Sequence, residues 1–342
     1  MKKKVVCIGA GTGQSAILSG LKEKDVELFG LVAVTDNGGH SGIIRKSLSL
    51  PQVGDSRSCL VSVAKEPLMR ELFSYRFSEG ELSGVNVGNL LIAALIQKHG
   101  SFLKGIDEAS KLLKTQATVL PVSDCDTHIG AELEDGSVYV GEWEIMERKS
   151  KSKIKRLFLS QKANANPACL EAIKNADLIV IGPGSLRTGL ISNLLVKGIP
   201  EALKSSKAKK VYVCNIMTQP GQTDGFSVKD HLNELEKYLG FRVDVVLMNN
   251  KLPKKELLER YKEDGSDFLE PMDCNGRVCV VKDLLDGREF EARAVGKGQK
   301  VDVHYIRHDP EKVADAVLDI LNQHTSKESI SALTISRSSS EK

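Results

Sequence analysis

The stretch Val5-Val-Cys-Ile-Gly-Ala-Gly-Thr-Gly13 decides the fold of this chain of 342 residues. Its four apolar residues predict a short buried strand, and a loop with three glycines follows directly. The residues after the loop place Ala16, Ile17, Leu18 and Leu21 on one face of a predicted helix. A strand, a glycine loop and a helix in this order open a doubly wound sheet. We therefore expect an α/β fold with a Rossmann-like, mostly parallel sheet.

Later segments of the chain repeat this pattern. Further apolar runs predict strands at 28–34, 178–181, 211–214 and 243–248. Helical patterns accompany the later runs, at about 167–175, 192–204 and 229–239. The alternation of short strands and helices supports one α/β domain covering residues 1–324.

The middle of the chain has a different pattern. The segment from Ile129 to Val140 alternates around Asp135-Gly136, and that dipeptide is a strong signal for a β-hairpin. We expect an antiparallel ribbon at about 117–160, inserted into the sheet domain and preceded by a small helical layer (87–98 and 101–114). The serine-rich segment 325–342 is low in complexity and is predicted to be a disordered tail.

The composition excludes several classes of protein. The chain has 48 basic and 45 acidic residues, a balance that argues against nucleic acid and against a membrane surface as partners. No run approaches the roughly 18 apolar residues of a membrane helix, and the run after Met1-Lys-Lys-Lys4 is too short for a signal peptide. The seven cysteines are scattered without a C-x-x-C pair. We expect buried, reduced thiols and a cytoplasmic protein.

The first glycine loop is a candidate phosphate site. Open α/β sheets bind ligands beyond the carboxyl ends of their strands, where this loop falls. Gly9, Gly11, Thr12 and Gly13 would bring backbone N–H groups close to a phosphate, and the helix dipole would favour its negative charge. The alternative is a tight turn between strand and helix.

The second strand also runs into a glycine-rich loop. Asp36 stands where a dinucleotide fold holds a ribose, and it could instead bind a metal or a ligand hydroxyl. Asn37, Gly38 and Gly39 follow it and suggest that the backbone itself contacts ligand. The alternative is a mobile polar loop. Farther along, Asp55 could cap a helix or bind ligand, and Asn89 could face ligand or solvent.

Two later strand exits are richer in hydrogen-bonding groups. The segment 182–188 combines the backbone of Gly184, the hydroxyl of Ser185 and the guanidinium of Arg187, a combination that favours anion binding over a simple turn. The segment 215–225 is interpreted as ligand-facing. Its candidate residues are Asn215, Thr218, Gln219, Thr223 and Asp224.

A third group could bind a metal. Asp124, Asp126 and His128 share a face if residues 123–129 form a strand, which would present two carboxylates and an imidazole. The alternative is an ordinary solvated face.

Together the loops resemble the gluconeogenesis factor (YvcK) family, which is similar in fold to the phospholactate transferase CofD. The resemblance covers about residues 4–320. The motifs that carry it are Gly9-Ala-Gly-Thr-Gly13, Asp36-Asn-Gly-Gly-His-Ser-Gly42, Gly54-Asp-Ser-Arg57, Gly88-Asn-Leu-Leu91, Gly182-Pro-Gly-Ser-Leu186 and Asn215-Ile-Met-Thr-Gln-Pro-Gly221. The resemblance implies a protein that binds UDP-sugars, notably UDP-N-acetylglucosamine, and supports cell-wall synthesis and cell shape during gluconeogenic growth. At the matching positions it implies that Tyr261 could stack on a base or sugar and that Arg307 could pair a phosphate, and the alternative is that both are surface helix residues.

The chain departs from the family pattern at three places. Asn37 replaces an aspartate, Ser58 replaces an asparagine, and Arg187 replaces a tyrosine. In the related transferases, an acidic pair at the second strand helps to hold the metal. An amide in place of one carboxylate removes a charged ligand, which weakens the case for transferase chemistry.

Two functions from different classes follow. The first is a regulatory protein that binds a nucleotide-sugar and acts through an unidentified protein partner. The second is a metal-dependent CofD-like transferase in which Asp36 and Asp55 would hold Mg²⁺, the candidate cofactor. An NAD-dependent dehydrogenase would need a more complete glycine fingerprint. We also expect the four glycine-rich loops (9–13, 36–42, 182–188 and 215–225) to converge on one cleft at the carboxyl edge of one sheet, Arg187 to face either a ligand phosphate or solvent, and the protein to form a homo-oligomer.

Overall fold

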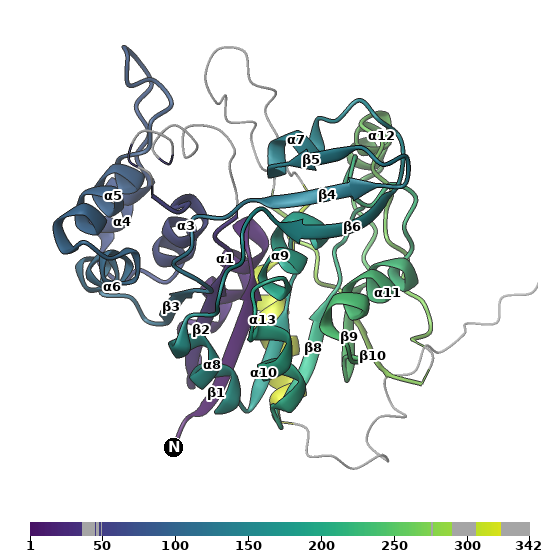
Figure 1. Cartoon of the computed structure of the whole chain (residues 1–342). Coiled ribbons are helices and arrows are strands. Elements are labelled where there is room, and N and C mark those ends of the chain that lie inside the picture. The colour runs from purple at the N-terminus through teal and green to yellow at the C-terminus, as the bar shows by residue number, and fades with distance from the viewer. Residues whose placement is uncertain (36–44, 46–47, 49, 275, 289–305, 323–342) are drawn as a thin grey trace, which may run out of the picture.

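The computed structural model describes residues 1–35, 45, 48, 50–274, 276–288 and 306–322 (Figure 1). Within these residues, seven strands form one sheet in the order β10-β9-β8-β7-β1-β2-β3, and every neighbouring pair is parallel. The strands are β1 (Lys3–Gly9), β2 (Val26–Val32), β3 (Thr118–Pro121), β7 (Leu178–Ile181), β8 (Lys209–Val213), β9 (Val245–Asn249) and β10 (Val278–Lys282). The predicted doubly wound, mostly parallel sheet is confirmed.

The central position of β1 explains its sequence. It pairs with β2 on one side and with β7 on the other, and the run from Val5 to Ile8 is almost fully buried. A strand that is covered on both faces carries a continuous apolar run, because neither set of alternating side chains meets water. The core therefore lies on both sides of this strand.

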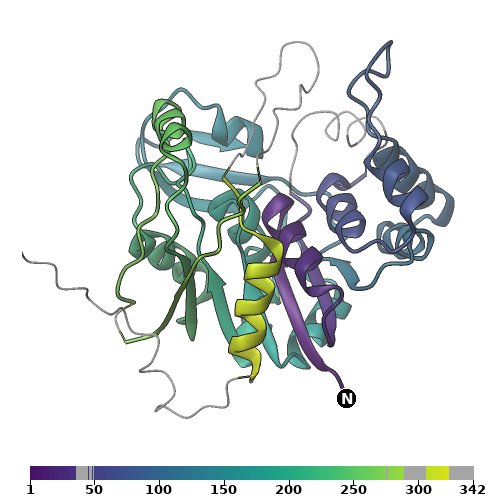
Figure 2. The same ribbon diagram turned by 180° about the vertical axis from the view of Figure 1, so that it is seen from behind.

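Helices cover both faces of the sheet (Figures 1 and 2). On one face α1 (Gly11–Leu21) packs beside α13 (Pro310–Asn322), and on the other lie α8 (Pro167–Lys174), α10 (Ile199–Ser205) and α11 (Val228–Leu239). A methyl group on Gly20 would overlap the carbonyl group of Pro310, so glycine lets α13 approach α1 closely. Lys3 and Leu321, 318 residues apart in the sequence, are joined by a hydrogen bond of 3.1 Å from Nζ to the carbonyl oxygen.

A layer of helices lies beside the β3 edge of the sheet. It contains α3 (Gly54–Ser62), α4 (Pro67–Ser74), α5 (Val87–His99) and α6 (Phe102–Leu113). The two helices predicted in this region, 87–98 and 101–114, are confirmed. Asn86 caps the start of α5, Gly100 ends it in the left-handed conformation, and Ser101 caps α6.

A small antiparallel sheet of order β5-β4-β6 lies across the carboxyl ends of the parallel strands (Figure 1). Its strands are β4 (Ile129–Leu133), β5 (Val138–Val140) and β6 (Ile154–Leu159), with α7 (Glu142–Met146) after β5. Gly136, at φ +85°, closes the predicted turn between β4 and β5. The ribbon begins later than expected from about 117, because residues 118–121 form β3 and pair in parallel with β2.

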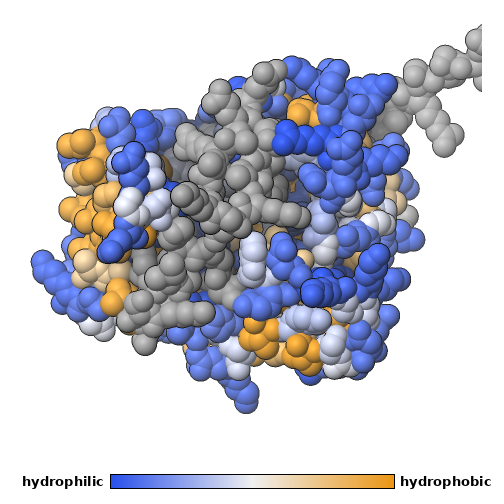
Figure 3. Space-filling model, turned by 90° about the horizontal axis from the view of Figure 1, so that it is seen from above, coloured by the Kyte–Doolittle hydropathy of each residue, from blue (hydrophilic) through white to orange (hydrophobic). Residues whose placement is uncertain are grey.

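The remaining described elements are short. They are the π-helix η1 (Leu186–Ile191), α9 (Ser192–Leu194) and α12 (Lys255–Glu263). None of the helices in the described ranges is long and apolar enough to cross a membrane. The predicted tail at 325–342 lies outside the described residues. Seen from above, much of the surface is hydrophilic, and apolar side chains gather on the side where α4–α6 lie (Figure 3).

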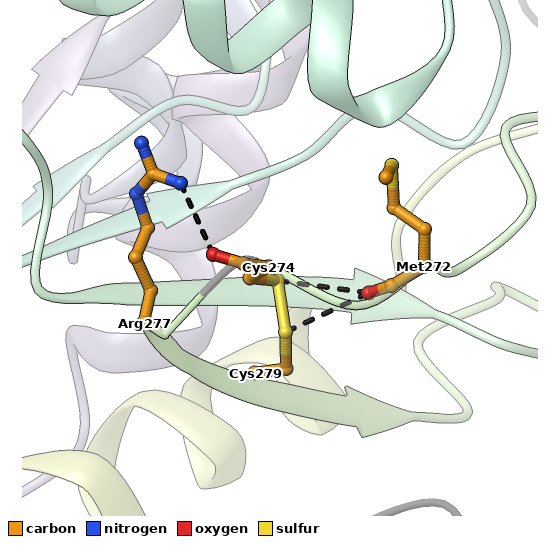
Figure 4. The surroundings of a disulfide bond; sticks show 4 residues. All are labelled: Met272, Cys274, Arg277 and Cys279. Atoms are coloured by element: carbon orange, nitrogen blue, oxygen red, sulfur yellow. Dashed lines mark hydrogen bonds between the residues drawn. A yellow bond between two sulfur atoms is a disulfide. The ribbon is translucent and has the colours of Figure 1, made fainter.

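The cysteine prediction is wrong for one pair. Cys274 and Cys279 form a disulfide that closes the turn before β10 (Figure 4). Arg277 lies within this turn, donates to the carbonyl oxygen of Cys274 at 3.1 Å and forms an ion pair with Glu236 of α11. The spacing of these two cysteines matches no motif, so their proximity depends on the turn. The other five are free thiols, and burial raises the pKa of Cys214 to about 12.

Candidate functional site

The N-terminus of α1 lies at the carboxyl edge of the sheet, directly after β1. Ala10 occupies the N-cap position in an extended conformation, and no side chain caps the helix there. Gly11 takes a φ of +61°, which an L-residue with a side chain rarely adopts. The carboxylate of Asp55, from the first turn of α3, accepts a hydrogen bond from the Gly11 N–H at 3.2 Å. Asp55 thus contacts the first glycine loop, whereas Thr12 is exposed to solvent.

The exit of β7 packs against this loop. A methyl group on Gly13 would overlap the carbonyl group of Pro183, and one on Gly184 would lie 3.3 Å from the carbonyl oxygen of Ala10. Asn193 of α9 donates to the carbonyl oxygen of Gly9 at 3.1 Å. The glycines at these positions therefore allow two backbone segments to touch where side chains would hold them apart.

The exit of β8 is joined to the same loop through one side chain. The amide oxygen of Asn215 accepts from the Gly184 N–H at 3.1 Å, and its amide nitrogen donates to the Gly184 carbonyl at 2.9 Å. A side chain that satisfies both backbone groups of one residue fixes that residue's orientation. The loops 9–13, 182–188 and the start of 215–225 therefore meet at this edge as expected, and their convergence on one cleft stays a prediction.

The rest of the 215–225 loop uses its polar groups differently from the expectation. Thr218 and Thr223 are buried, and their hydroxyl groups accept from the N–H groups of Asp267 and Gln219, both at 2.8 Å. The carboxylate of Asp224 accepts from the Gly221 N–H at 3.0 Å. These groups stabilise the fold of the loop, because each compensates a backbone donor that the turn leaves without a partner.

Sequence reasoning missed two members of a polar cluster beside these loops. The amide oxygen of Gln222 accepts from the Ser185 hydroxyl at 2.7 Å, and the hydroxyls of Ser185 and Thr188 lie 2.5 Å apart. Thr188 also donates to a carboxylate oxygen of Glu142, from α7 of the small sheet, at 2.6 Å. The cluster therefore connects the small sheet with the exits of β7 and β8. Gln222 lies inside a segment chosen for its polar composition, but no sequence signal indicates Glu142.

Arg187 occupies neither of the two positions expected for it. Its side chain is buried, and Nη1 donates to the Gln222 carbonyl oxygen at 2.5 Å. Nε lies 3.5 Å from a carboxylate oxygen of Glu234, and the guanidinium lies over the ring of Phe226, 5.1 Å from its centroid. Burial lowers the pKa of Arg187 and the nearby Glu234 carboxylate opposes that shift. Arg187 thus holds the loop against α11.

The two residues implied late in the chain lie on separate segments. Tyr261 of α12 is half-buried, and its hydroxyl accepts from the Ile306 N–H at 3.1 Å. Arg307 is half-buried, and its carbonyl oxygen accepts from the Asp286 N–H at 2.9 Å. Asn89 lies in the helical layer on α5, where its N–H donates to Asn86 at 3.0 Å.

The metal predictions have different outcomes. Asp36, Asn37, Gly38 and Gly39 lie outside the described residues, so the pairing of Asp36 with Asp55 stays a prediction. Residues 123–128 do not form the expected strand, and Asp126 instead forms an ion pair with Arg45 at 2.5 Å. In the part of the chain that the structure describes, no three acidic, histidine or cysteine residues are grouped to hold a metal ion.

The fold and the loops at its carboxyl edge are those of a CofD-like protein. The family described as 2-phospho-L-lactate transferase CofD matches residues 5–284. A Thermotoga maritima relative is 45% identical over 92% of this chain and 98% of its own. The gluconeogenesis factor of Bacillus subtilis is 38% identical over 94% of this chain and 99% of its own. The chain belongs to the gluconeogenesis factor (YvcK) family of CofD-like proteins.

A solved structure agrees with this assignment. The crystal structure of a UPF0052 family protein from Bacillus halodurans superposes with a TM-score of 0.85 at 38% identity. The alignment covers 93% of this chain and 99% of the other. The fold is therefore shared along nearly the whole length of both proteins.

A buried histidine at this edge predicts a pH dependence of stability. His308 is buried, which lowers its pKa from 6.5 to about 4, although a hydrogen bond to the Cys214 backbone opposes the shift. Above pH 6.5 the His308 imidazole is neutral in both the folded and the unfolded state, so it does not change the free energy of unfolding. As the pH falls from 6.5 towards 4, only the unfolded state takes up the proton, so the folded state loses stability.

We expect the free energy of unfolding to fall by about 2 kcal/mol between pH 7 and pH 5 through His308 alone. Urea denaturation of His308→Gln at both pH values should show a correspondingly smaller loss. The matched control is His99→Gln, a change at an exposed histidine at the end of α5. An identical pH slope in the parent and in His308→Gln would contradict the prediction.

Proposed function

We propose that this protein is a regulatory protein that binds a UDP-sugar, with UDP-N-acetylglucosamine as the first candidate. In this proposal it acts in the cytoplasm, through an unidentified protein partner, and supports cell-wall synthesis and cell shape during gluconeogenic growth. The gluconeogenic part rests on the family and on the names of its relatives. The proposal that the ligand is a UDP-sugar rests on the geometry of the candidate site at the N-terminus of α1.

One observation carries the ligand proposal: three strand exits meet at the N-terminus of α1, where the N-cap residue Ala10 offers no capping side chain and Asp55 takes the N–H of Gly11. The first turn of a helix presents backbone N–H groups and about half a positive charge, so it favours an anion such as a diphosphate. The neighbouring hydroxyl, amide and carboxylate groups of Ser185, Gln222 and Glu142 suit the hydroxyl groups of a sugar.

The alternative is a metal-dependent transferase of the CofD type, favoured by the family match. Two features of the chain fit such a metal poorly. Asp55 already accepts a backbone hydrogen bond from Gly11, and Asn37 stands where the family pattern has a second carboxylate. We therefore derive no catalytic step for this chain. Whether ligand binding requires Mg²⁺ distinguishes the transferase from the regulatory protein.

Calorimetry with UDP-N-acetylglucosamine, UDP and NAD, each with and without Mg²⁺, tests both functions. We expect the UDP-sugar to bind at least tenfold more tightly than NAD and to bind without the metal. At about 100 times its Kd, the ligand should raise the free energy of unfolding by roughly 2.7 kcal/mol. Tighter binding of NAD would overturn the proposal. Binding that requires Mg²⁺ would favour the transferase.

The Asn215→Ala variant localises the site. Loss of both hydrogen bonds to Gly184 frees the β7 exit, and we expect the affinity for the UDP-sugar to fall about tenfold, a change of about 1.4 kcal/mol. Asn175→Ala, which changes an exposed asparagine at the end of α8, is the matched control and should bind normally. Unchanged affinity in Asn215→Ala would place the ligand elsewhere.

A further inference from the structure

The disulfide between Cys274 and Cys279 lies at the edge of the fold, where one of its sulfur atoms can be reached (Figure 4). Cys279 is the second residue of β10, an edge strand of the described sheet. Cys279 is half-buried, whereas Cys274 is only 2% exposed. A small thiol or disulfide reagent therefore approaches the sulfur of Cys279, while that of Cys274 is shielded.

The surroundings of the two sulfur atoms suit the reduced state as well as the disulfide. The carbonyl oxygen of Met272 lies 3.7 Å from Sγ of Cys274 and 3.6 Å from Sγ of Cys279. In the reduced state each cysteine carries an S–H group, which is a weak hydrogen-bond donor. Reduction of the disulfide therefore leaves the new thiols with a hydrogen-bond acceptor within reach.

The chain just before the disulfide is bonded to the exit of β8. Residues 267–269 pair with residues 216–218, the part of the exit that follows Asn215. The N–H of Thr218 donates to the carbonyl oxygen of Asp267 at 2.8 Å, and the N–H of Leu269 donates to that of Ile216 at 2.9 Å. Since Asn215 fixes Gly184 at the exit of β7, the segment 267–269 supports the loops of the candidate site.

Only part of this pairing rests on the main core of the protein. Leu269 packs in that core, whereas Ile216, Met217 and Phe268 belong to a small apolar cluster that is separate from it. Segments with few contacts to the main core open locally at a low cost in free energy. The position of 267–269 therefore depends on how its ends are held, and the disulfide holds the end that leads to β10.

A second set of contacts leads from the disulfide to the exit of β7. Arg277, which lies between the two cysteines, donates to the carbonyl oxygen of Cys274 at 3.1 Å and forms an ion pair with Glu236 of α11. The same helix carries Glu234, a carboxylate oxygen of which lies 3.5 Å from Nε of Arg187. The disulfide turn thus has contacts to both strand exits that meet at the N-terminus of α1.

We propose that Cys274 and Cys279 form a reversible thiol–disulfide exchange site, and that its oxidation state changes the ligand affinity of the candidate site. The co-reactant is a low-molecular-weight disulfide such as glutathione disulfide. The effect on the ligand rests on the proposed function, and so does the cytoplasmic location. In that compartment a protein disulfide is usually transient and serves catalysis or redox sensing, which favours a switch over a permanent cross-link.

The exchange balances in atoms and electrons. The Cys279 thiol loses its proton, and the thiolate attacks one sulfur of glutathione disulfide, which breaks that S–S bond and releases one glutathione thiolate. The Cys274 thiol then loses its proton, and its thiolate attacks the Cys279 sulfur of the mixed disulfide and releases the second glutathione thiolate. The two released thiolates take up the two protons. The protein has then lost two electrons and two protons, and two glutathione thiols have formed.

A redox titration of the full chain tests the exchange. The protein is equilibrated in buffers that range from reduced glutathione alone to glutathione disulfide alone, free thiols are alkylated after acid quenching, and the peptides are analysed by mass spectrometry. We expect the Cys274–Cys279 pair to pass from dithiol to disulfide within this range. A pair that stays a disulfide in reduced glutathione, or a dithiol in glutathione disulfide, would overturn the proposal.

Hydrogen exchange on the two forms tests the coupling to the β8 exit. We expect the amides of Thr218 and Leu269 to exchange at least tenfold faster in the dithiol form, and the amides of β1 to exchange equally in both. Cys274→Ser with Cys279→Ser should behave as the dithiol form in every buffer. Cys125→Ser, a change at a half-buried free thiol, is the matched control and should respond to glutathione as the parent does. Equal exchange in the two forms of the parent would contradict the coupling.

Calorimetry with UDP-N-acetylglucosamine on the oxidised and the reduced protein tests the effect on the ligand. We expect the dithiol form and the double serine variant to bind at least threefold more weakly than the disulfide form. Equal affinity of the two forms would overturn the proposed effect on the ligand. Absence of binding to either form would instead contradict the proposed function, and the titration and the hydrogen exchange would still decide whether the exchange site exists.

Discussion

Arg187→Ala is expected to lower the free energy of unfolding by about 3 kcal/mol, a larger effect than that of an ordinary surface substitution. The guanidinium is buried between the carbonyl of Gln222, the ring of Phe226 and the carboxylate of Glu234. Its removal leaves Glu234, whose side chain is 14% exposed, with Lys237 at 4.0 Å in place of the buried guanidinium. Urea denaturation at pH 7 measures the loss.

Two further variants separate this role from phosphate binding. Arg187→Met combined with Glu234→Gln removes both charges, so the double variant should be more stable than Arg187→Ala. Arg70→Ala, at an exposed position on α4, should remain within about 0.5 kcal/mol of the parent. A different result would assign Arg187 to a phosphate contact rather than to a structural role. In that result Arg187→Ala keeps its stability, binds UDP-N-acetylglucosamine at least tenfold more weakly than the parent at low salt, and binds it as well as the parent at high salt.

Gly13→Ala is expected to lower the free energy of unfolding by about 3 kcal/mol and to weaken UDP-sugar binding at least tenfold. The added methyl group would lie 2.8 Å from the carbonyl carbon of Pro183 and 3.1 Å from the nitrogen of Gly184. Both neighbours are backbone atoms that a rotamer change cannot move. The N-terminus of α1 and the β7 exit must therefore separate, which disturbs the candidate anion site from both sides.

The control for Gly13→Ala is Gly287→Ala, because a methyl group at Gly287 meets nothing within 4 Å. It should change neither stability nor affinity. Calorimetry and urea denaturation on both variants give the two readouts. A Gly13→Ala protein that binds the UDP-sugar normally would show that the ligand does not use this junction, whatever its stability.

Much of the fold could be predicted because its signals are local. A continuous apolar run indicates a strand buried on both faces, as β1 is, and Asn86, Gly100 and Ser101 mark helix ends by their own side chains or backbone freedom. The segment 118–121 could not be assigned in this way. It is short and apolar, and only its pairing with β2, far away in the sequence, makes it part of the parallel sheet.

The meeting of the loops could be predicted, but not the role of each side chain. Topology alone brings strand exits to one edge, so the meeting of the loops follows from the order of strands. Composition does not tell which way a polar group points. Thr218 and Thr223 look ligand-facing by type, yet each bonds to a nearby backbone group. Arg187 finds its partner 35 residues farther along the chain, beyond the reach of any local pattern.

The pairing of α1 with α13 has a consequence for synthesis on the ribosome. Strand β1 and helix α1 leave the ribosome early, but the helix that covers them is made last among the described elements. Until α13 emerges, the apolar side of α1 that it covers remains open to water or to a chaperone. Translation at roughly 5–20 residues per second makes that interval tens of seconds for two segments 318 residues apart. The nascent chain therefore keeps this side of α1 uncovered by its final partner throughout most of its synthesis.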